Sequence, residues 1–390
     1  MFEDIKARDE ASVLQTYARF PVALREGRNA VCKDFDGNEF VDFTSGIGVN
    51  SLGFCDAQWA KAVSDQLMTL QHTSNLFYTL PGIQTAQTLC DRTGMQKAFF
   101  CNSGAEANEG AIKAARKYSY LKYKEGRSTV VSLKNSFHGR TLTTLSATGQ
   151  DAFHRYFFPF TEGFIFADPD DPSDIISKAG SGVCAVIMEL VQGEGGVIPL
   201  KHAMVQDIAD ICREQDILLI IDEVQTGAGR TGTLFCFEQY GIMPDIVTAA
   251  KGLGGGLPFG VILFSGRAQG ALAKGDHATT FGANPAICAG ACEVLRRLDD
   301  AFLQNVKRKG QYIRDILQTL PHIKSVTGMG LMLGAELEGA DVADVLASGI
   351  REGVLLLSAK KKLRLLPPLT IMYDDMDRGL AALRRALESL

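Results

Sequence analysis

The sequence predicts an α/β protein with two domains: a large one built on a mostly parallel sheet, and a smaller α+β one formed by both termini. Between about residues 59 and 293, seven short apolar runs alternate with helical patterns. These runs are apolar on both faces, which is typical of parallel strands that helices cover on both sides. The segments on either side show a different pattern of predicted strands and helices. A chain of 390 residues is long enough for two or three domains.

The elements are expected in the following order. Residues 31–34 and 39–43 form a hairpin, because the Asp-Gly pair between them suits a tight turn. The strands of the large domain are predicted at residues 98–101, 129–133, 164–167, 184–188, 218–221, 246–249 and 261–264. Helical stretches follow residue 294, and then strands at residues 331–337, 354–357 and 363–366. The large domain is therefore residues 59–293, and residues 1–58 and 294–390 form the small one.

Composition excludes several classes of protein. The formal net charge is −5 without a basic block, so no nucleic-acid partner is expected. No apolar run approaches the roughly 18 residues that indicate a membrane span. The nine cysteines are scattered singly without a metal-type pair, which predicts reduced thiols, a cytoplasmic protein and no metal site.

Two charged residues follow predicted strands of the large sheet. Asp222 comes directly after the run 218–221, and Lys251 ends the next run and precedes the glycine-rich segment 252–256. Ligands bind at the carboxyl ends of strands in open α/β sheets. In dinucleotide sites the glycines open a helix without an intervening Lys, and in a P-loop the Lys follows the glycines. The order here favours another cofactor.

The segment 101–107 predicts a strand that ends in a polar turn and leads into a helix. Free backbone N–H groups at the start of that helix, with the Ser103 hydroxyl, form a site for a phosphate. Together with Lys251 and Asp222, this site requires a phosphorylated cofactor with a carbonyl group for the amine and a ring nitrogen for the carboxylate. Pyridoxal phosphate (PLP) has all three.

Five segments resemble class III (ornithine-type) aminotransferases of PLP fold type I. They are residues 102–109 (NSGAEANE), 136–141 (SFHGRT), 192–196 (QGEGG), 222–227 (DEVQTG) and 250–256 (AKGLGGG). The resemblance runs from about residue 17 to the C-terminus, keeps motif order and spacing, and within the class is greatest to the acetylornithine aminotransferases. It implies PLP fold type I and transfer of an amino group from a small-molecule donor, N-acetylornithine, to 2-oxoglutarate.

The resemblance also implies how PLP is held. Lys251 would bind it covalently and then act as general base, while Asp222 would keep the ring nitrogen protonated. The other cofactor contacts fall on Ser103, Gly104, Ala105, Phe137, Val224, Gln225 and Thr280. Phe137 and Val224 would enclose the ring between them. Thr280 matches a residue that reaches the phosphate from the neighbouring subunit, which implies a homodimer with a shared active site.

Four further residues match substrate contacts of the family. Arg140 resembles the arginine that binds the carboxylate distal to the reacting amine, with Tyr17 near it. Arg364 resembles the arginine for the α-carboxylate of glutamate, and Glu194 matches the residue that pairs with it while the other substrate is bound. The chain departs from the family at Ala283, where a glycine is usual in the loop that carries the neighbouring-subunit contact.

Other functions stay open at this point. Relatives that act on ornithine, succinylornithine, succinyl-diaminopimelate or γ-aminobutyrate share every cofactor residue. A PLP-dependent aminomutase has the same scaffold but retains the amino group. A dinucleotide-dependent oxidoreductase is a further alternative, which the position of Lys251 before the glycines disfavours. A non-catalytic binding protein is another, which the presence of Lys251, Asp222 and both arginines disfavours.

Overall fold

Seven strands form the largest sheet of the protein, in the order β4-β12-β11-β10-β7-β5-β6. The computed structural model describes residues 1–390 except the side chains of Pro172 and Ile176. The strands are β4 (Lys97–Cys101), β5 (Thr129–Leu133), β6 (Phe164–Ala167), β7 (Val183–Met188), β10 (Leu218–Asp222), β11 (Ile246–Ala250) and β12 (Gly260–Phe264). Strand β12 alone runs opposite to the other six: its pairs with β11 and β4 are antiparallel, and the remaining pairs are parallel. The prediction of a mostly parallel sheet is confirmed.

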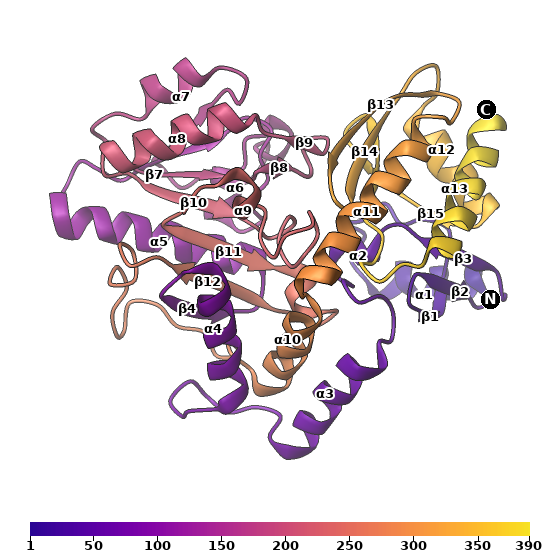
Figure 1. Ribbon diagram of the computed structural model, residues 1–390, viewed down its shortest axis with the longest axis horizontal. Coiled ribbons are helices and arrows are strands. Elements are labelled where there is room, and N and C mark those ends of the chain that lie inside the picture. The colour runs from indigo at the N-terminus through magenta and orange to yellow at the C-terminus, as the bar shows by residue number, and fades with distance from the viewer.

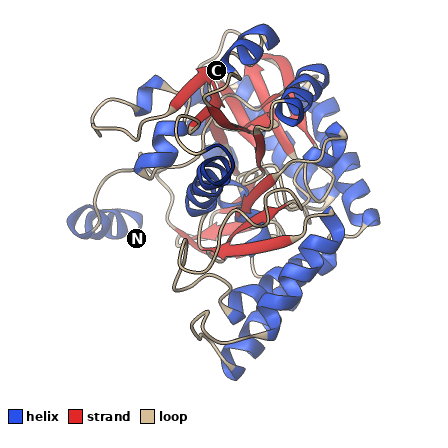
Figure 2. Cartoon of the chain, turned by 90° about the vertical axis from the view of Figure 1, so that its left-hand side faces the viewer, coloured by secondary structure: helices blue, strands red, loops and turns tan.

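Helices cover both faces of this sheet (Figures 1 and 2). Leu218 and Ile220 join an apolar cluster with helix α5 (Gly104–Tyr123), whereas Leu219 and Ile221 join the cluster on the opposite face, which contains residues of α8 (His202–Glu214). Because β7, β10, β11 and β12 are buried along their whole length, they read as continuous apolar runs.

The remaining helices and strands between residues 57 and 297 are short or pack at the periphery of the seven-stranded sheet. They are α3 (Ala57–Thr69), α4 (Leu80–Thr93), α6 (Leu142–Ala147), η1 (Asp151–Phe153), α7 (Pro172–Lys178), β8 (Val191–Gln192), β9 (Ile198–Pro199), α9 (Phe237–Tyr240), η2 (Lys251–Gly254) and α10 (Pro285–Arg297). Helix α10 packs against both α3 and α4. In the described part of the chain, no helix has the length and apolarity that a membrane crossing requires.

Segments from both ends of the chain form the second part of the molecule, at the right of Figure 1. One sheet has the order β1-β2-β3-β15 and the other β13-β14-β17-β16. The strands are β1 (Leu24–Arg28), β2 (Val31–Asp34), β3 (Glu39–Asp42), β13 (Ile323–Met329), β14 (Met332–Leu337), β15 (Val354–Leu355), β16 (Leu357–Ala359) and β17 (Lys362–Leu365). The helices are α1 (Phe2–Ser12), α2 (Ser45–Gly48), α11 (Asp300–Leu317), α12 (Val342–Glu352) and α13 (Tyr373–Glu388). Strand β15 pairs with β3, so the N- and C-terminal segments share a sheet.

The division into residues 59–293 and the two flanks stays a proposal. The boundaries proposed at residues 58 and 293 both fall inside helices, α3 and α10, which pack against each other. Each of these helices crosses a proposed boundary, and the two helices contact each other. They therefore connect the residues before each boundary with those after it.

Two details of the small part differ from the sequence prediction. The strand expected at residues 354–357 is in fact two strands, β15 and β16, which belong to different sheets. The chain changes sheets at Leu356, and the unbroken apolar run hides that change. Strand β13 was not predicted, because most of its residues are half-buried and show no alternation between an apolar and a polar face.

Candidate active site

A cavity of about 680 Å³ lies at the carboxyl edge of β10 and β11. The two strands are parallel neighbours, and Asp222 is in register with Thr248, three residues before Lys251. Ten of the residues predicted from the sequence line the cavity: Tyr17, Ser103, Gly104, Ala105, Phe137, Arg140, Asp222, Val224, Gln225 and Lys251. The sheet therefore brings segments from distant parts of the sequence to one place.

Lys251 follows β11 directly and has a positive φ of 44°. A non-glycine residue in this region is strained, and such strain is common at functional sites. The backbone requires glycine at Gly255, which also has a positive φ and where a Cβ would lie 2.6 Å from Trp59 Nε1. Burial lowers the pKa of the Lys251 amine, and the nearby carboxylates of Asp222 and Glu194 partly oppose this. The amine thus loses its proton more readily than a surface lysine does.

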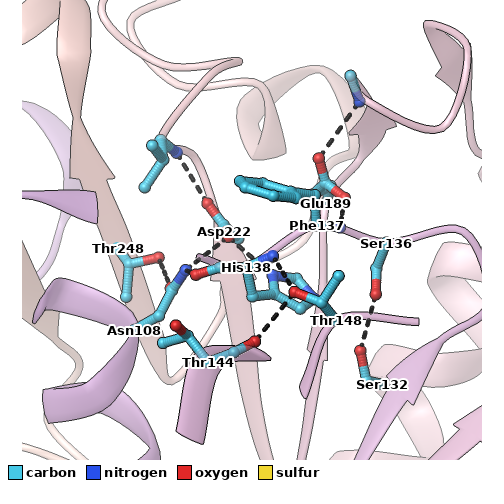
Figure 3. Close-up of polar contacts among 12 residues, drawn as sticks. Asn108, Ser132, Ser136, Phe137, His138, Thr144, Thr148, Glu189, Asp222 and Thr248 are labelled. Carbon is cyan, nitrogen blue, oxygen red and sulfur yellow. Dashed lines mark hydrogen bonds and ion pairs between the residues drawn. The ribbon is translucent and has the colours of Figure 1, made fainter. Parts of the chain in front are cut away.

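Asp222 is held by three donors (Figure 3). Its Oδ2 accepts hydrogen bonds from Asn108 Nδ2 and His138 Nδ1, both at 2.8 Å, and its Oδ1 accepts one from Val224 N at 3.0 Å. Thr248 Oγ1 in turn donates to Asn108 Oδ1 at 2.7 Å. The carboxylate is buried and fixed in orientation, and Oδ1 retains a lone pair for a further donor.

The sequence interpretation assigned no role to Asn108 or Thr248. Asn108 lies on α5, just over one turn after the polar segment at its start, and Thr248 lies on the strand beside Asp222. The correct order of strands in the sheet would predict that both residues lie near Asp222, but the sequence alone does not give that order. His138 donates its backbone N–H to Thr148 Oγ1, and its Nε2 has no partner among the described residues.

Ser103 caps helix α5, because its Oγ accepts a hydrogen bond from Glu106 N at 3.2 Å. Gly104 and Ala105 are the first residues of the helix, and the described residues offer no acceptor for their N–H groups outside it. A Cβ on Gly104 would lie 2.6 Å from Val224 Cγ1, so only glycine allows this close approach. The helix start is therefore a compact anion site, where the Ser103 hydroxyl still has its proton to donate.

Glu189 is a buried carboxyl that the sequence interpretation missed. It follows β7, and its Oε2 accepts a hydrogen bond from Phe137 N at 2.9 Å while Oε1 accepts one from Gly193 N at 3.2 Å. Burial raises the pKa of Glu189 to about 7. Figure 3 shows Glu189 beside Phe137. Its side chain connects the backbone of Phe137 with the turn that carries Glu194.

Arg364 and Glu194 do not line the cavity but form an ion pair beside it. Arg364 Nη1 also donates to Gln225 Oε1 at 3.3 Å, and Gln225 does line the cavity. Arg364 lies in β17 and is 3% exposed, whereas Glu194 is partly exposed. The buried guanidinium is therefore matched by a carboxylate that has access to solvent.

Arg140 is exposed and lines the cavity together with Tyr17. Among the described residues it has no partner in a hydrogen bond or an ion pair, and its guanidinium carbon lies 4.1 Å from the centroid of the Phe153 ring. Its N–H groups are therefore available to a ligand.

Thr280 is exposed and lies outside the cavity lining of its own chain. Asn102, which lines the cavity, donates from Nδ2 to Thr279 Oγ1 at 3.2 Å. Ala283 in the same loop has a positive φ of 57°, the conformation for which the family's usual glycine is suited. The loop thus keeps a left-handed backbone despite the alanine.

Comparison with known proteins places this geometry in a family. A model of the class-III aminotransferases matches residues 13–387. The chain belongs to the class III aminotransferase family. Its substrates are accordingly a small-molecule amino donor and a keto acid.

Three relatives illustrate the similarity. The acetylornithine aminotransferase of Haemophilus ducreyi is 54% identical over 390 residues, covering 100% of this chain and 99% of that protein. The crystal structure of the Toxoplasma gondii ornithine aminotransferase, with partial occupancy of PLP at its active site, has a TM-score of 0.95 at 30% identity and covers 100% of this chain and 94% of that one. The N-acetylornithine aminotransferase of Stenotrophomonas maltophilia has a TM-score of 0.84 at 33% identity, with 98% of each chain covered. The predicted PLP fold type I is confirmed.

Proposed function

We propose that this class III aminotransferase transfers the terminal amino group of N-acetylornithine to 2-oxoglutarate with PLP, yielding N-acetylglutamate 5-semialdehyde and glutamate, a reaction of arginine biosynthesis. One observation carries the choice of substrates: Arg140 has no hydrogen bond or ion pair with any described residue, whereas Arg364 is already paired with Glu194. The full-length similarity to acetylornithine aminotransferases supports the same choice.

The cavity fits PLP. The unsatisfied N–H groups of Gly104 and Ala105 suit a phosphate, and Asp222 Oδ1 keeps a lone pair for a ring N–H. The Lys251 amine has no hydrogen-bond partner among the described residues and lines the same cavity. Phe137 and Val224 also line it, and we assign them to the two faces of the ring, with Ser103 and Gln225 among the polar contacts.

When bound, PLP supplies a carbonyl group that reacts with amines and a ring that stabilises negative charge on the adjacent carbon. The protein supplies the proton transfers. Burial favours the neutral form of Lys251 Nζ, so this atom can take a proton from the carbon beside the reacting nitrogen and return it. Asp222, fixed by its three donors, would hold the protonated ring nitrogen through its negative charge.

The two arginines serve two substrates that differ in charge. N-acetylornithine carries one carboxylate, far from the reacting amine, and Arg140 binds it. Glutamate carries a second carboxylate next to its amine, and Arg364 binds it when Glu194 moves away. While N-acetylornithine occupies the site, the ion pair with Glu194 prevents Arg364 from remaining buried without a counter-charge.

We further propose a homodimer in which Thr280 completes the partner's site. The segment between α3 and α4 exposes large apolar side chains, with Leu76 88% and Tyr78 98% exposed. Asn75 in this segment donates from Nδ2 to Thr279 O and Gly282 O, so the apolar surface adjoins the Thr280 loop. A second copy of the chain would cover this surface.

The cytoplasm is the compartment we propose. In the described part of the chain all nine cysteines are free. Unpaired thiols suit a reducing compartment.

The substrate assignment is tested by comparing kcat/KM for N-acetylornithine, N-succinylornithine, ornithine and γ-aminobutyrate, with 2-oxoglutarate as acceptor. We expect the highest value for N-acetylornithine, with glutamate formed in equal amount. A preference for unacylated ornithine would contradict the proposal. An aminomutase would instead isomerise the amine without forming glutamate.

A further inference from the structure

The Arg140 side chain needs a support that the substrate contacts alone do not provide. It is exposed, and no described residue forms a hydrogen bond or an ion pair with it. A free arginine side chain loses rotamer entropy when it is immobilised. A binding site is therefore more effective if the guanidinium is already held before the substrate arrives.

Two aromatic rings surround this guanidinium. Its central carbon lies 4.1 Å from the centroid of Phe153 and 5.6 Å from that of Phe137. The two rings pack edge to face, with centroids 6.0 Å apart and an interplanar angle of 73°. When a guanidinium stacks on a ring it uses its flat face, so the N–H groups along its edge stay free for a carboxylate.

Phe153 is itself fixed by the segment around it. It ends the short helix η1, where Phe153 N donates to Gln150 O at 3.0 Å. Gln150 Nε2 donates to Ser136 O at 3.0 Å, which connects this segment to the residue before Phe137. On the other side, His154 Nε2 donates to Leu145 O at 2.8 Å. The backbone on the two sides of Phe153 is thus tied to the loop that carries Arg140 and to helix α6, which follows that loop.

We infer that Phe153 is a positioning residue: its ring holds the Arg140 guanidinium toward the cavity and so sets the preference for amines that carry a distal carboxylate. The inference rests on the proposed function, in which Arg140 binds that carboxylate. It adds a determinant of substrate choice that neither the cavity lining nor the sequence motifs include.

The test uses the PLP-loaded enzyme and two amines, N-acetylornithine and pentylamine, which has no carboxylate. The measured quantity is the preference, the ratio of kcat/KM for the first amine to that for the second. We expect Phe153→Leu to lower the preference about five-fold, corresponding to about 1 kcal/mol, mainly through KM for N-acetylornithine. We expect Phe153→Tyr to retain the preference of the unaltered enzyme, because tyrosine keeps an aromatic face.

Two further variants sharpen the test. Phe160→Leu is a matched control, because Phe160 packs on His154 and Phe158 in the same loop, whereas the cation–π contacts of Arg140 in the described structure are with Phe137 and Phe153. We expect it to keep the preference. In a double-mutant cycle, Phe153→Leu should change the preference no further once Arg140→Ala is present, since both changes remove the same interaction.

Two results would overturn the inference. One is an equal loss for both amines in Phe153→Leu, which would show that the ring acts by supporting Phe137. The other is additivity of Phe153→Leu and Arg140→Ala. If the unaltered enzyme itself shows no preference for N-acetylornithine over pentylamine, the proposed role of Arg140 fails, and this is seen without any variant.

Discussion

At the scale of single residues, Asn108 decides how Asp222 faces the cavity. Its amide donates to Asp222 Oδ2 at 2.8 Å and is itself held by Thr248 Oγ1. Asn108→Ala removes a hydrogen bond to a charged group, which typically contributes about 1.5 to 3 kcal/mol. We expect the affinity for PLP to fall about tenfold or more, as measured by titrating the cofactor-free protein with PLP and following absorbance.

Ser132→Ala is the matched control for this experiment. Ser132 is buried and hydrogen-bonded to Ser136 at 3.0 Å, but it does not contact Asp222 (Figure 3). We expect its affinity for PLP to match that of the unaltered protein. Equal affinities in Asn108→Ala and Ser132→Ala would contradict the role given to Asn108.

Ala283 is a second residue with a measurable effect, in this case on stability. Its φ of 57° lies in the left-handed region, which costs a residue with a Cβ about 1 to 2 kcal/mol, whereas glycine costs about 0.5 to 1 kcal/mol in chain entropy. We expect Ala283→Gly to raise the free energy of unfolding by about 0.5 kcal/mol in chemical denaturation. Ala286→Gly, within helix α10, should lower it by about 1 kcal/mol. A loss of stability in both variants would refute this account.

Single residues also show where sequence reasoning ends. The sequence predicts Asp222 and Lys251 because the first ends a buried strand and the second directly follows one, and the order of the motifs indicates which segments act together with them. Asn108, Glu189 and Phe153 act through contacts with segments distant in sequence, and those contacts depend on how strands and loops are placed in space. The hydrophobic periodicity of the sequence does not predict how these strands and loops are placed in space.

At the scale of elements, helix α11 contains a buried lysine with a pH-dependent effect. Lys309 Nζ donates to Leu369 O at 3.0 Å, and burial lowers its pKa from 10.5 to about 8. Between these two pH values the folded protein has released the proton that the unfolded chain still binds. Stability therefore rises with pH across that window relative to a variant without the amine.

The comparison is between the unaltered protein and Lys309→Met, with unfolding free energies measured at several pH values from about 7 to 10.5. Above pH 8 we expect the unfolding free energy of the unaltered protein to increase relative to that of Lys309→Met. Below pH 8 we expect the difference between the two free energies to be constant. Parallel profiles over the whole range would contradict the burial of a titrating amine.

Elements differ in how well the sequence predicts them. The sequence predicts all seven strands of the large sheet from short apolar runs, and four of them, β7, β10, β11 and β12, are buried along their whole length. Strand β13 is mostly half-buried, and β15 and β16 follow each other without a break in apolarity. For such segments the sheet that each strand joins is decided by tertiary packing, which a local pattern does not record.

At the scale of the whole molecule, the proposed homodimer predicts that two defective subunits can restore one site. Lys251→Ala lacks the reactive amine, and Thr280→Ala lacks the contact proposed for the partner's phosphate. In a mixed dimer, one site combines an intact Lys251 from one subunit with an intact Thr280 from the other. Co-expressing both variants should therefore give more activity than the mean of the two expressed separately. Activity equal to that mean would count against a shared site.

The central claim is that Lys251 holds PLP and that N-acetylornithine is the amino donor. The most direct measurement is the absorption spectrum of the PLP-loaded protein before and after N-acetylornithine is added, beside that of Lys251→Ala. We expect a visible band that disappears with N-acetylornithine, returns with 2-oxoglutarate and is altered in the variant. A band that does not respond to N-acetylornithine would contradict the substrate, and the lack of any band with PLP supplied would contradict the role of Lys251.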